Sequence, residues 1–405
     1  MRIKYSSLKS RLFLILYAVA AFSKLQANLW TPYYDNDFVY IGYVAIITLW
    51  GIILMITQQK FKITKALKIT LLAAGFIFVW GILWTNPTFK SLIYENAIKM
   101  LVMILFITLT SFLVDYYDCM KGFLTTSYFV QVGFLISNLF LHVEKKNWMY
   151  NIQTIFQSGV KDKLGYGTHA NICGLVILIT FSIGLLLKGF VNRQHRMIIT
   201  AINSVLWVML ITTAARMAIL CCLLLYIIIY TSRLFQNRQE LWLKIVKSSF
   251  FVLVAFFVFA SIYVEKFYNF FMLVNRYYAV SYYLDLYKAS QRWLMGIGYV
   301  NFGQLPKVLT AYGFPITFAE CTYVDIFVTT GIIGSIWLTT YFAMLIRYTM
   351  KSKYLNTPSL KIKMLAILVV VIIAGMAENV GFTDAYWISY AFLTLCMCMI
   401  RRTTT

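Results

Sequence analysis

Charged residues are scarce in this 405-residue chain, and acidic residues are the scarcer kind. Only 12% of the residues are charged, whereas 61% are hydrophobic. Soluble domains hold roughly two apolar residues for each charged one, so this composition excludes a soluble globular protein. Apolar stretches recur from Leu12 to Ile400, which a single cleaved signal peptide does not explain. The sequence therefore predicts a chain embedded in a membrane along its length.

Histidine is also rare, and the cysteines lack the spacing of a metal or disulfide framework. The chain has three histidines and seven cysteines, without a Cys-x-x-Cys pair. We therefore expect no metal, no cofactor and no disulfide. Lys and Arg number 36 against 14 for Asp and Glu, a net charge of +22. Most of that charge lies between hydrophobic segments, so we expect a lipid bilayer and no nucleic acid as the partner.

Apolar segments of about 20 residues predict one all-α, polytopic transmembrane domain over residues 1–405, with about twelve spans. The two candidates around Arg216 also fit one long broken helix. The spans lie at 11–29, 38–57, 65–84, 94–114, 123–143, 167–187, 197–214, 216–231, 246–264, 319–346, 362–378 and 384–400.

Basic residues accumulate in alternate loops, which orients the chain by the positive-inside rule. An N-terminus in the cytoplasm puts roughly twice as many Lys and Arg inside as outside, and it also puts the C-terminus inside. Two long loops, 144–166 and 265–318, carry most of the positive charge that this topology leaves outside. Most acidic residues also fall near the outer face. We therefore expect the charged side chains of a functional site to lie at the outer face.

The loop at 265–318 is the predicted extracytoplasmic loop, and Arg276 and Arg292 lie in it. Its stretch Phe267–Trp293 is amphipathic and rich in tyrosine, which predicts an interfacial helical insert. A solvated connector is the alternative. Tyr282 and Tyr283 fit stacking on sugar rings and, equally, anchoring at the interface.

Arg216 is the sharpest intramembrane feature, within Thr212-Thr213-Ala214-Ala215-Arg216-Met217-Ala218. Small neighbours let helices approach closely, so such an arginine can face a cavity. Snorkelling to the headgroups is the alternative. Arg276 and Arg292 add two guanidiniums on the same predicted side, and guanidinium forks suit phosphate or pyrophosphate. We expect these arginines to bind an anionic, phospholipid-like headgroup.

Four segments, in this order, resemble the O-antigen ligase/polymerase superfamily, and most of all its Wzy-type polysaccharide polymerases. They span about 170 residues, and each motif is weak alone. The segments are Leu164-Gly165-Tyr166-Gly167-Thr168-His169-Ala170-Asn171, then Thr213-Ala214-Ala215-Arg216, then Asn275-Arg276 with Met295-Gly296-Ile297-Gly298-Tyr299-Val300-Asn301-Phe302, then Thr330-Gly331-Ile332-Ile333-Gly334.

The resemblance implies a GT-C-like fold in the bacterial plasma membrane and a metal-independent glycosyltransferase. Its substrates would be undecaprenyl-pyrophosphate-linked glycans of O-antigen, capsule or exopolysaccharide. A hydroxyl of a new repeat unit would attack the anomeric carbon of the growing chain, and undecaprenyl pyrophosphate would leave. A protein that regulates chain length is a further partner implied by the family. Preorganised arginines suit the negative charge that develops on the leaving pyrophosphate.

Residue roles follow from the resemblance in the same way. Arg216 and Arg276 would bind the donor pyrophosphate, with Arg292 as a third candidate outside the motif. Glu320 is the candidate base or acceptor-orienting group, against an ordinary carboxylate at a helix start. The remaining candidate substrate contacts are His169, Asn171, Tyr282, Tyr283, Tyr323 and Asp325; Asp325 also fits buried polar packing, and His169 and Asn171 also fit a structural role at a helix start.

Two other functions share parts of this pattern. An O-antigen ligase would share the donor, the fold and the arginines, but this chain has Phe318-Ala319-Glu320-Cys321-Thr322-Tyr323 where the ligase branch has a histidine. A lipid-linked oligosaccharide flippase or another transporter suits twelve spans. Transporters of that kind usually show repeated halves with polar residues at the midplane, and the sequence shows no such repeat.

Overall fold

The computed structural model describes residues 2–26, 37–58, 68, 71–72, 75–76, 79–80, 90–141, 170–234, 241, 274–298, 308–309, 315–316, 321–376, 378 and 387–402. Among these residues the chain is almost wholly helical. The helices are α1 (Arg2–Gln26), α2 (Asp37–Gln58), α4 (Lys90–Tyr116), α5 (Met120–Leu141), α7 (Ala170–Leu187), α8 (Arg193–Thr213), α9 (Arg216–Leu234), α12 (Val274–Ala289), α13 (Thr322–Thr349), α14 (Pro358–Ala374) and α15 (Trp387–Arg401). Two short strands, β1 (Val308–Leu309) and β2 (Pro315–Ile316), pair antiparallel.

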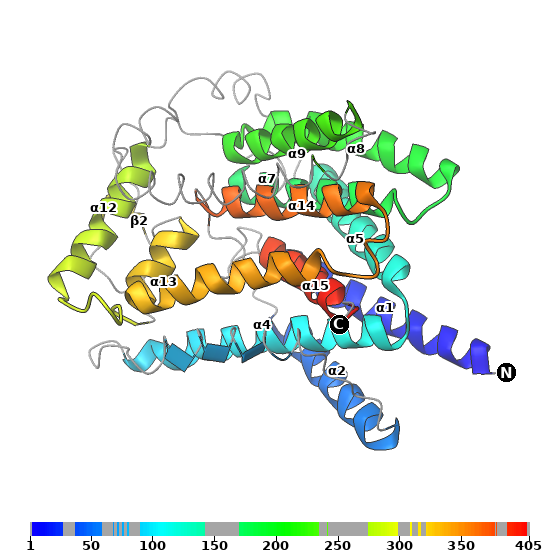
Figure 1. Cartoon of the computed structure of the whole chain (residues 1–405), viewed down its shortest axis with the longest axis horizontal. Helices are drawn as coiled ribbons and strands as arrows, with labels where there is room; N and C mark the ends of the chain where they lie inside the picture. The colour runs from blue at the N-terminus through cyan, green and yellow to red at the C-terminus, as the bar shows by residue number, and fades with distance from the viewer. Residues whose placement is uncertain are drawn as a thin grey trace.

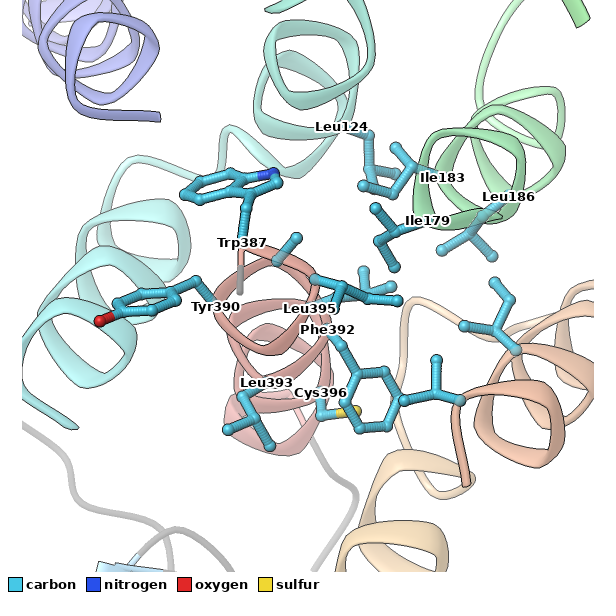
Figure 2. Packing of buried hydrophobic residues seen from close by; sticks show 14 of the residues in the cluster. Leu124, Ile179, Ile183, Leu186, Trp387, Tyr390, Phe392, Leu393, Leu395 and Cys396 are labelled. Atoms are coloured by element: carbon cyan, nitrogen blue, oxygen red, sulfur yellow. The ribbon is translucent and has the colours of Figure 1, made fainter. Parts of the chain in front are cut away.

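The helix α15 is buried on every side and forms the centre of the bundle. All its residues from Trp387 to Arg401 are buried, and it contacts α1, α4, α7 and α13. Figure 2 shows its side chains in one apolar cluster with Leu124 of α5 and Ile179 and Ile183 of α7. A helix that is apolar all round is expected in such a position.

Hydrogen bonds between buried side chains join neighbouring helices inside the bundle. The hydroxyl groups of Tyr17 on α1 and Ser127 on α5 lie 2.9 Å apart. The Tyr128 hydroxyl on α5 donates to Asn203 Oδ1 on α8 across 2.7 Å. In a membrane, apolar burial does not drive helices together, so such bonds and close packing hold them.

Apolar side chains also cover the outside of the bundle. Val205 and Val208 of α8 and Leu223 and Ile227 of α9 are about half exposed. The helices α7, α8 and α13 are long and apolar enough to cross a membrane, and shorter apolar helices lie within α2, α4, α9 and α15. An apolar outer surface around a packed core is what a bilayer requires. The chain is thus an all-α protein whose helices indicate several membrane crossings.

Most predicted spans coincide with helices. Each one overlaps a described helix except those at 65–84 and 246–264. The span at 65–84 is helical at its described positions, and that at 246–264 lies outside the described residues. Since α7, α8 and α13 are the helices of full spanning length and apolarity in the described part, about twelve crossings stays a prediction.

The two spans around Arg216 are separate helices and not one broken helix. The ring of Trp207 on α8 lies 5.7 Å from the ring of Tyr226 on α9. In a continuous helix these residues would stand about 28 Å apart. The chain therefore folds back where Ala214 adopts a left-handed conformation, with φ 51° and ψ 24°.

The predicted insert at 265–318 is helical in part. The helix α12 lies within the stretch expected to be helical, and it packs on α13. The β1–β2 hairpin follows it, with Val308 opposite Ile316. The sequence did not predict this hairpin, because strands of two residues are too short to show an alternating pattern.

The bundle has two distinct ends, joined by α13. At the Arg402 end, where α4 and α15 finish, the Arg402 guanidinium pairs with Asp115 and lies 3.1 Å from Asp118. The amide of Lys353, beyond α13, donates to the Arg402 carbonyl. At the Arg216 end lie the starts of α7, α9 and α13 and the end of α14. Figure 1 shows α12 beside the start of α13 and the beginning of α1 on the opposite side of the bundle.

Candidate functional site

Arg216 is the first residue of α9, directly after the turn that ends α8. The Thr213 side chain holds this turn: its hydroxyl donates to the Leu210 carbonyl and accepts from the Ala215 amide, at 2.7 and 3.2 Å. Arg216 is half-buried, whereas Ala215 next to it is buried. The first turn of α9 thus places a guanidinium at a helix N-terminus, where the helix dipole already favours anions.

The helix α7 approaches this turn unusually closely through Gly174. A Cβ on Gly174 would lie 2.4 Å from Ala215 Cβ and 3.0 Å from Ala218 Cβ. The small residues around Arg216 therefore allow close helix contact, as expected from the sequence. Asn171 lies one turn before Gly174, half-buried, at the start of α7. Asn171 and Arg216 consequently lie at the same end of the bundle.

The end of α14 brings the start of α13 to α9. Cys221, on α9, donates its thiol to the Val370 carbonyl of α14 across 3.5 Å. Two residues later on α14, the Ile372 carbonyl accepts a 2.5 Å hydrogen bond from the Tyr323 hydroxyl. The Thr322 amide donates to the Gly375 carbonyl at 2.9 Å. Tyr323 is thus held at the Arg216 end by main-chain acceptors on α14.

Three helix N-termini therefore gather at the Arg216 end. The helices α7, α9 and α13 begin there with Asn171, Arg216 and Tyr323 in their first turns. Their partial positive charges add to the charge of Arg216. The end of α14 contributes the opposite dipole, but its last carbonyls are bonded to Tyr323 and Thr322. This arrangement suits an anionic group better than a cation.

The insert helix α12 packs on the first turns of α13. Tyr283 and Tyr287 of α12 are buried in a small apolar cluster with Val324 and Val328 of α13. Burial raises the pKa of the Tyr283 phenol, and the carboxylate of Asp325 raises it further. Burial also raises the pKa of Tyr287 to about 12. These phenols therefore stay neutral at physiological pH.

This packing buries one of two adjacent tyrosines of α12 more than the other. Tyr283 is buried between α12 and α13, which favours anchoring of the insert over stacking on a sugar. Tyr282 is only half-buried, and burial raises its pKa. Asp325 is buried in the first turn of α13, which agrees with the polar-packing alternative. Stacking on Tyr282 stays a prediction.

The helix α13 is broken at Gly331, whose φ of 68° and ψ of −164° are not helical. A break leaves carbonyls of the first segment and amides of the second without helical partners. Each such group costs several kcal/mol in a membrane if it stays unpaired. Here the segment 293–298 supplies the partners. The Ile297 and Gly298 amides donate to the Val328 and Thr329 carbonyls, both across 2.9 Å.

The second segment of α13 is paired by the same stretch. The amides of Ile332 and Ile333 donate to the carbonyls of Trp293 and Leu294, at 3.1 and 3.2 Å. The Trp80 indole donates to the Thr330 carbonyl across 3.1 Å. The two glycine motifs that the sequence resemblance used separately are therefore one structural unit, which we call the glycine joint (residues 293–298 and 328–333).

The remaining predicted residues are distributed as follows. Arg292 is exposed in the turn after α12, directly before the glycine joint. Arg276 lies in the first turn of α12, and its side chain is outside the described part of the structure. Glu320 and His169 are also outside the described residues. The structure thus brings Asn171, Arg216 and Tyr323 to one end, and it links Tyr283 and Asp325 to that end through α13.

Sequence reasoning missed several residues that shape this end. Thr322 holds the chain beyond α14, because its hydroxyl donates to the Glu378 carbonyl at 3.0 Å. Gly174 lets α7 approach the Ala215 and Ala218 side chains closely, and Gly296 and Gly331 meet through main-chain atoms. A glycine in an apolar helix opposite a small-residue motif is the one feature that could have indicated the first contact.

No family model matches the chain, and no curated protein matches it. The resemblance to the O-antigen ligase/polymerase superfamily accordingly rests on the sequence motifs alone. Among the described residues, no group of three or more His, Cys, Asp or Glu side chains is placed to hold a metal ion.

Proposed function

We propose that this protein is a polysaccharide polymerase of the outer face of the bacterial plasma membrane. It joins undecaprenyl-pyrophosphate-linked repeat units and releases undecaprenyl pyrophosphate. The observation that carries the proposal is the meeting of Asn171, Arg216 and Tyr323 at the Arg216 end. Asn171 and Arg216 come from separate motif segments, and Tyr323 comes from the segment that departs from the ligase branch. The charge pattern assigns all three helix starts to the outer side.

The chemistry divides between donor and acceptor. The acceptor hydroxyl attacks the anomeric carbon of the growing glycan, the bond from that carbon to the pyrophosphate oxygen breaks, and the electron pair leaves with undecaprenyl pyrophosphate. Arg216 and Arg276 stabilise the charge on the leaving pyrophosphate, with Arg292 as a third candidate. Glu320 takes the hydroxyl proton or orients the hydroxyl. Asn171 contacts the sugar or the phosphate oxygens, and Tyr323 contacts the sugar, since its hydroxyl proton is donated to the Ile372 carbonyl.

A reconstituted reaction tests the proposal. Purified protein in liposomes receives the lipid-linked repeat unit, and the products are separated by size. Wild type should form a ladder of multimers, and Arg216→Ala should lower the rate at least about a hundredfold. Arg347→Ala is the control, because Arg347 is an exposed arginine in the last turn of α13, at the opposite end of the bundle from Arg216. Equal rates for the two variants would remove Arg216 from the chemistry.

A flippase is the second candidate, because of the break in α13. Discontinuous membrane helices often mark the substrate site of transporters. A flippase would move the lipid-linked unit across liposomes without forming multimers. The same reconstituted protein therefore distinguishes the two functions when transport and ladder formation are measured in parallel. Transfer of glycan onto lipid A core would instead indicate a ligase.

A further inference from the structure

The glycine joint fixes one particular turn at the level of the membrane boundary. Residues 332–349 form the second segment of α13 and span about 27 Å at 1.5 Å per residue. That length is close to the hydrocarbon thickness of a bilayer, about 30 Å. Gly331 therefore lies near the outer boundary of the membrane when the second segment crosses it. The segment 293–298, which is hydrogen-bonded to α13 around Gly331, lies at the same level.

Both glycines at the joint are required by conformation and by space. Gly296 has φ +77° and Gly331 has φ +68°. A Cβ on Gly331 would lie 2.5 Å from the Leu294 oxygen and 2.6 Å from the Gly296 nitrogen. A Cβ on Gly296 would lie 2.4 Å from the Thr329 oxygen. Main-chain atoms on both sides leave no room for a side chain, so any substitution must separate the two segments.

Arg292 is tied directly to this contact. Its carbonyl accepts from the amides of Met295 and Gly296, at 3.1 and 2.8 Å. Its own amide donates to the Ser290 hydroxyl at 3.3 Å. The position of the Arg292 main chain therefore depends on Gly296, which is held in turn against Gly331.

The turn held in this way presents apolar side chains next to a positive charge. Trp293 and Leu294 are 48% and 57% exposed, although their carbonyls are fixed by the amides of α13. Ile332 and Ile336 continue the exposed apolar surface along α13. Rigid main chain beneath exposed Trp and Leu beside Arg292 is suited to a lipid with an anionic headgroup.

We propose that Gly296 and Gly331 are positioning residues that hold Arg292 at the membrane boundary, where its guanidinium meets the pyrophosphate of a polyprenyl-linked substrate. The first isoprenoid units of that lipid lie against Trp293, Leu294 and Ile332. This assignment rests on the proposed function for the identity of the lipid. It adds the route by which the headgroup is recognised before the chemistry at Arg216.

A binding cycle tests the proposal without turnover. The full chain in nanodiscs is titrated with geranylgeranyl pyrophosphate as the probe, and the dissociation constant is compared for wild type, Gly331→Ala, Arg292→Ala and the double variant. Each single variant should weaken binding about tenfold, and the double variant should be no more than about twofold weaker than either one. Non-additivity is expected because the glycine acts through the arginine. Additive losses would overturn the proposal.

Control measurements identify the cause of any loss. Gly133→Ala on α5 is the matched substitution, because a Cβ there meets nothing within 4 Å, and it should leave binding unchanged. If Gly331→Ala does not fold, Trp80→Phe removes the indole donor to Thr330 and keeps an aromatic ring. It should weaken binding about threefold, again without adding to Arg292→Ala. Unchanged binding in Trp80→Phe would count against the joint.

The source of the anion is tested in separate arms. Inorganic pyrophosphate should compete with the probe, whereas vesicles of phosphatidylglycerol should not. Competition by the vesicles alone would mean that Arg292 only anchors the protein to bulk lipid. If the binding losses of Gly331→Ala and Arg292→Ala are non-additive but no polymer forms, the proposed polymerase is refuted and the positioning role stands. If polymer forms and the binding losses are additive, the positioning role is refuted and the proposed polymerase stands.

Discussion

The contact between Gly174 and Ala215 allows a quantitative prediction about the Arg216 end. In Gly174→Ala the new methyl would lie 2.4 Å from Ala215 Cβ, whereas ordinary contact begins at about 3.4 Å. The helices α7 and α9 must then move apart by about 1 Å. Overpacking of this kind costs about 1 to 3 kcal/mol, and the better helix propensity of alanine returns up to about 1 kcal/mol.

The effect on catalysis should exceed the effect on stability. A displacement of about 1 Å can lower a rate by about a hundredfold when it misplaces a catalytic group. We therefore expect Gly174→Ala to unfold at lower denaturant in mixed micelles, and to polymerise at least about tenfold more slowly while folded. The unfolding midpoint and the rate of ladder formation are measured on the same preparation.

A compensating substitution tests whether the contact between Gly174 and Ala215 positions Arg216. Ala215→Gly removes the methyl that Gly174→Ala would strike, so the double variant should recover most of the lost rate. Recovery stays partial, because Ala218 Cβ would still lie 3.0 Å away. If Gly174→Ala is as active as wild type, or if Ala215→Gly does not improve it, the close contact does not position Arg216.

Three further predictions concern other parts of the molecule. Arg401→Ala should destabilise the protein by about 1 to 3 kcal/mol without changing the polymerisation rate, because buried Arg401 donates to Ser111 Oγ at 2.9 Å and to the Thr108 carbonyl at 3.1 Å, far from the Arg216 end. Arg402→Ala should cost about 1 kcal/mol or less, because the partners of Arg402 are partly exposed. A larger loss of stability in Arg402→Ala than in Arg401→Ala would contradict this prediction. Tyr128→Phe should lower the free energy of unfolding by about 0.6 to 1.7 kcal/mol through its lost bond to Asn203, whereas Tyr230→Phe, at an exposed tyrosine of α9, should have no measurable effect. Packing of α12 on α13 should be unaffected by pH below about 10 and should weaken as pH rises from about 10 to 12, because burial raises the pKa of Tyr287 to about 12 in the folded protein. Tyrosinate absorbance during a pH titration measures the ionisation of Tyr287, with Tyr287→Phe as the control. Ionisation of Tyr287 at the pKa of free tyrosine would contradict the prediction.

The apolar runs predicted the helical elements well, because a membrane helix needs a long apolar segment and little else. The boundary between α8 and α9 was less clear from the sequence. Ala214 adopts a left-handed conformation there, and alanine gives no indication of this, whereas glycine would. The contact between Trp207 and Tyr226 shows that α8 and α9 are separate helices, and such a tertiary contact cannot be read from the sequence.

The candidate site was predictable in its parts and not in its assembly. The motifs named Asn171 and Arg216, and Tyr323 was a separate candidate contact. Their meeting depends on the end of α14, which carries no recognisable motif. The partnership of Gly296 with Gly331 is a tertiary contact between main-chain groups, and residue types alone do not specify it. From the sequence, Tyr283 fitted sugar stacking and interfacial anchoring equally, and its burial against α13 depends on a tertiary contact that residue types do not specify.

The most direct test of the account is the stoichiometry of the reconstituted reaction. Wild-type protein receives the lipid-linked repeat unit without added metal, and new glycosidic linkages and released undecaprenyl pyrophosphate are counted together. The account predicts a ladder of multimers with one undecaprenyl pyrophosphate released for each linkage formed, and the loss of both products in Arg216→Ala. Movement of the intact lipid-linked unit across the liposome, with neither linkage nor release, would contradict it.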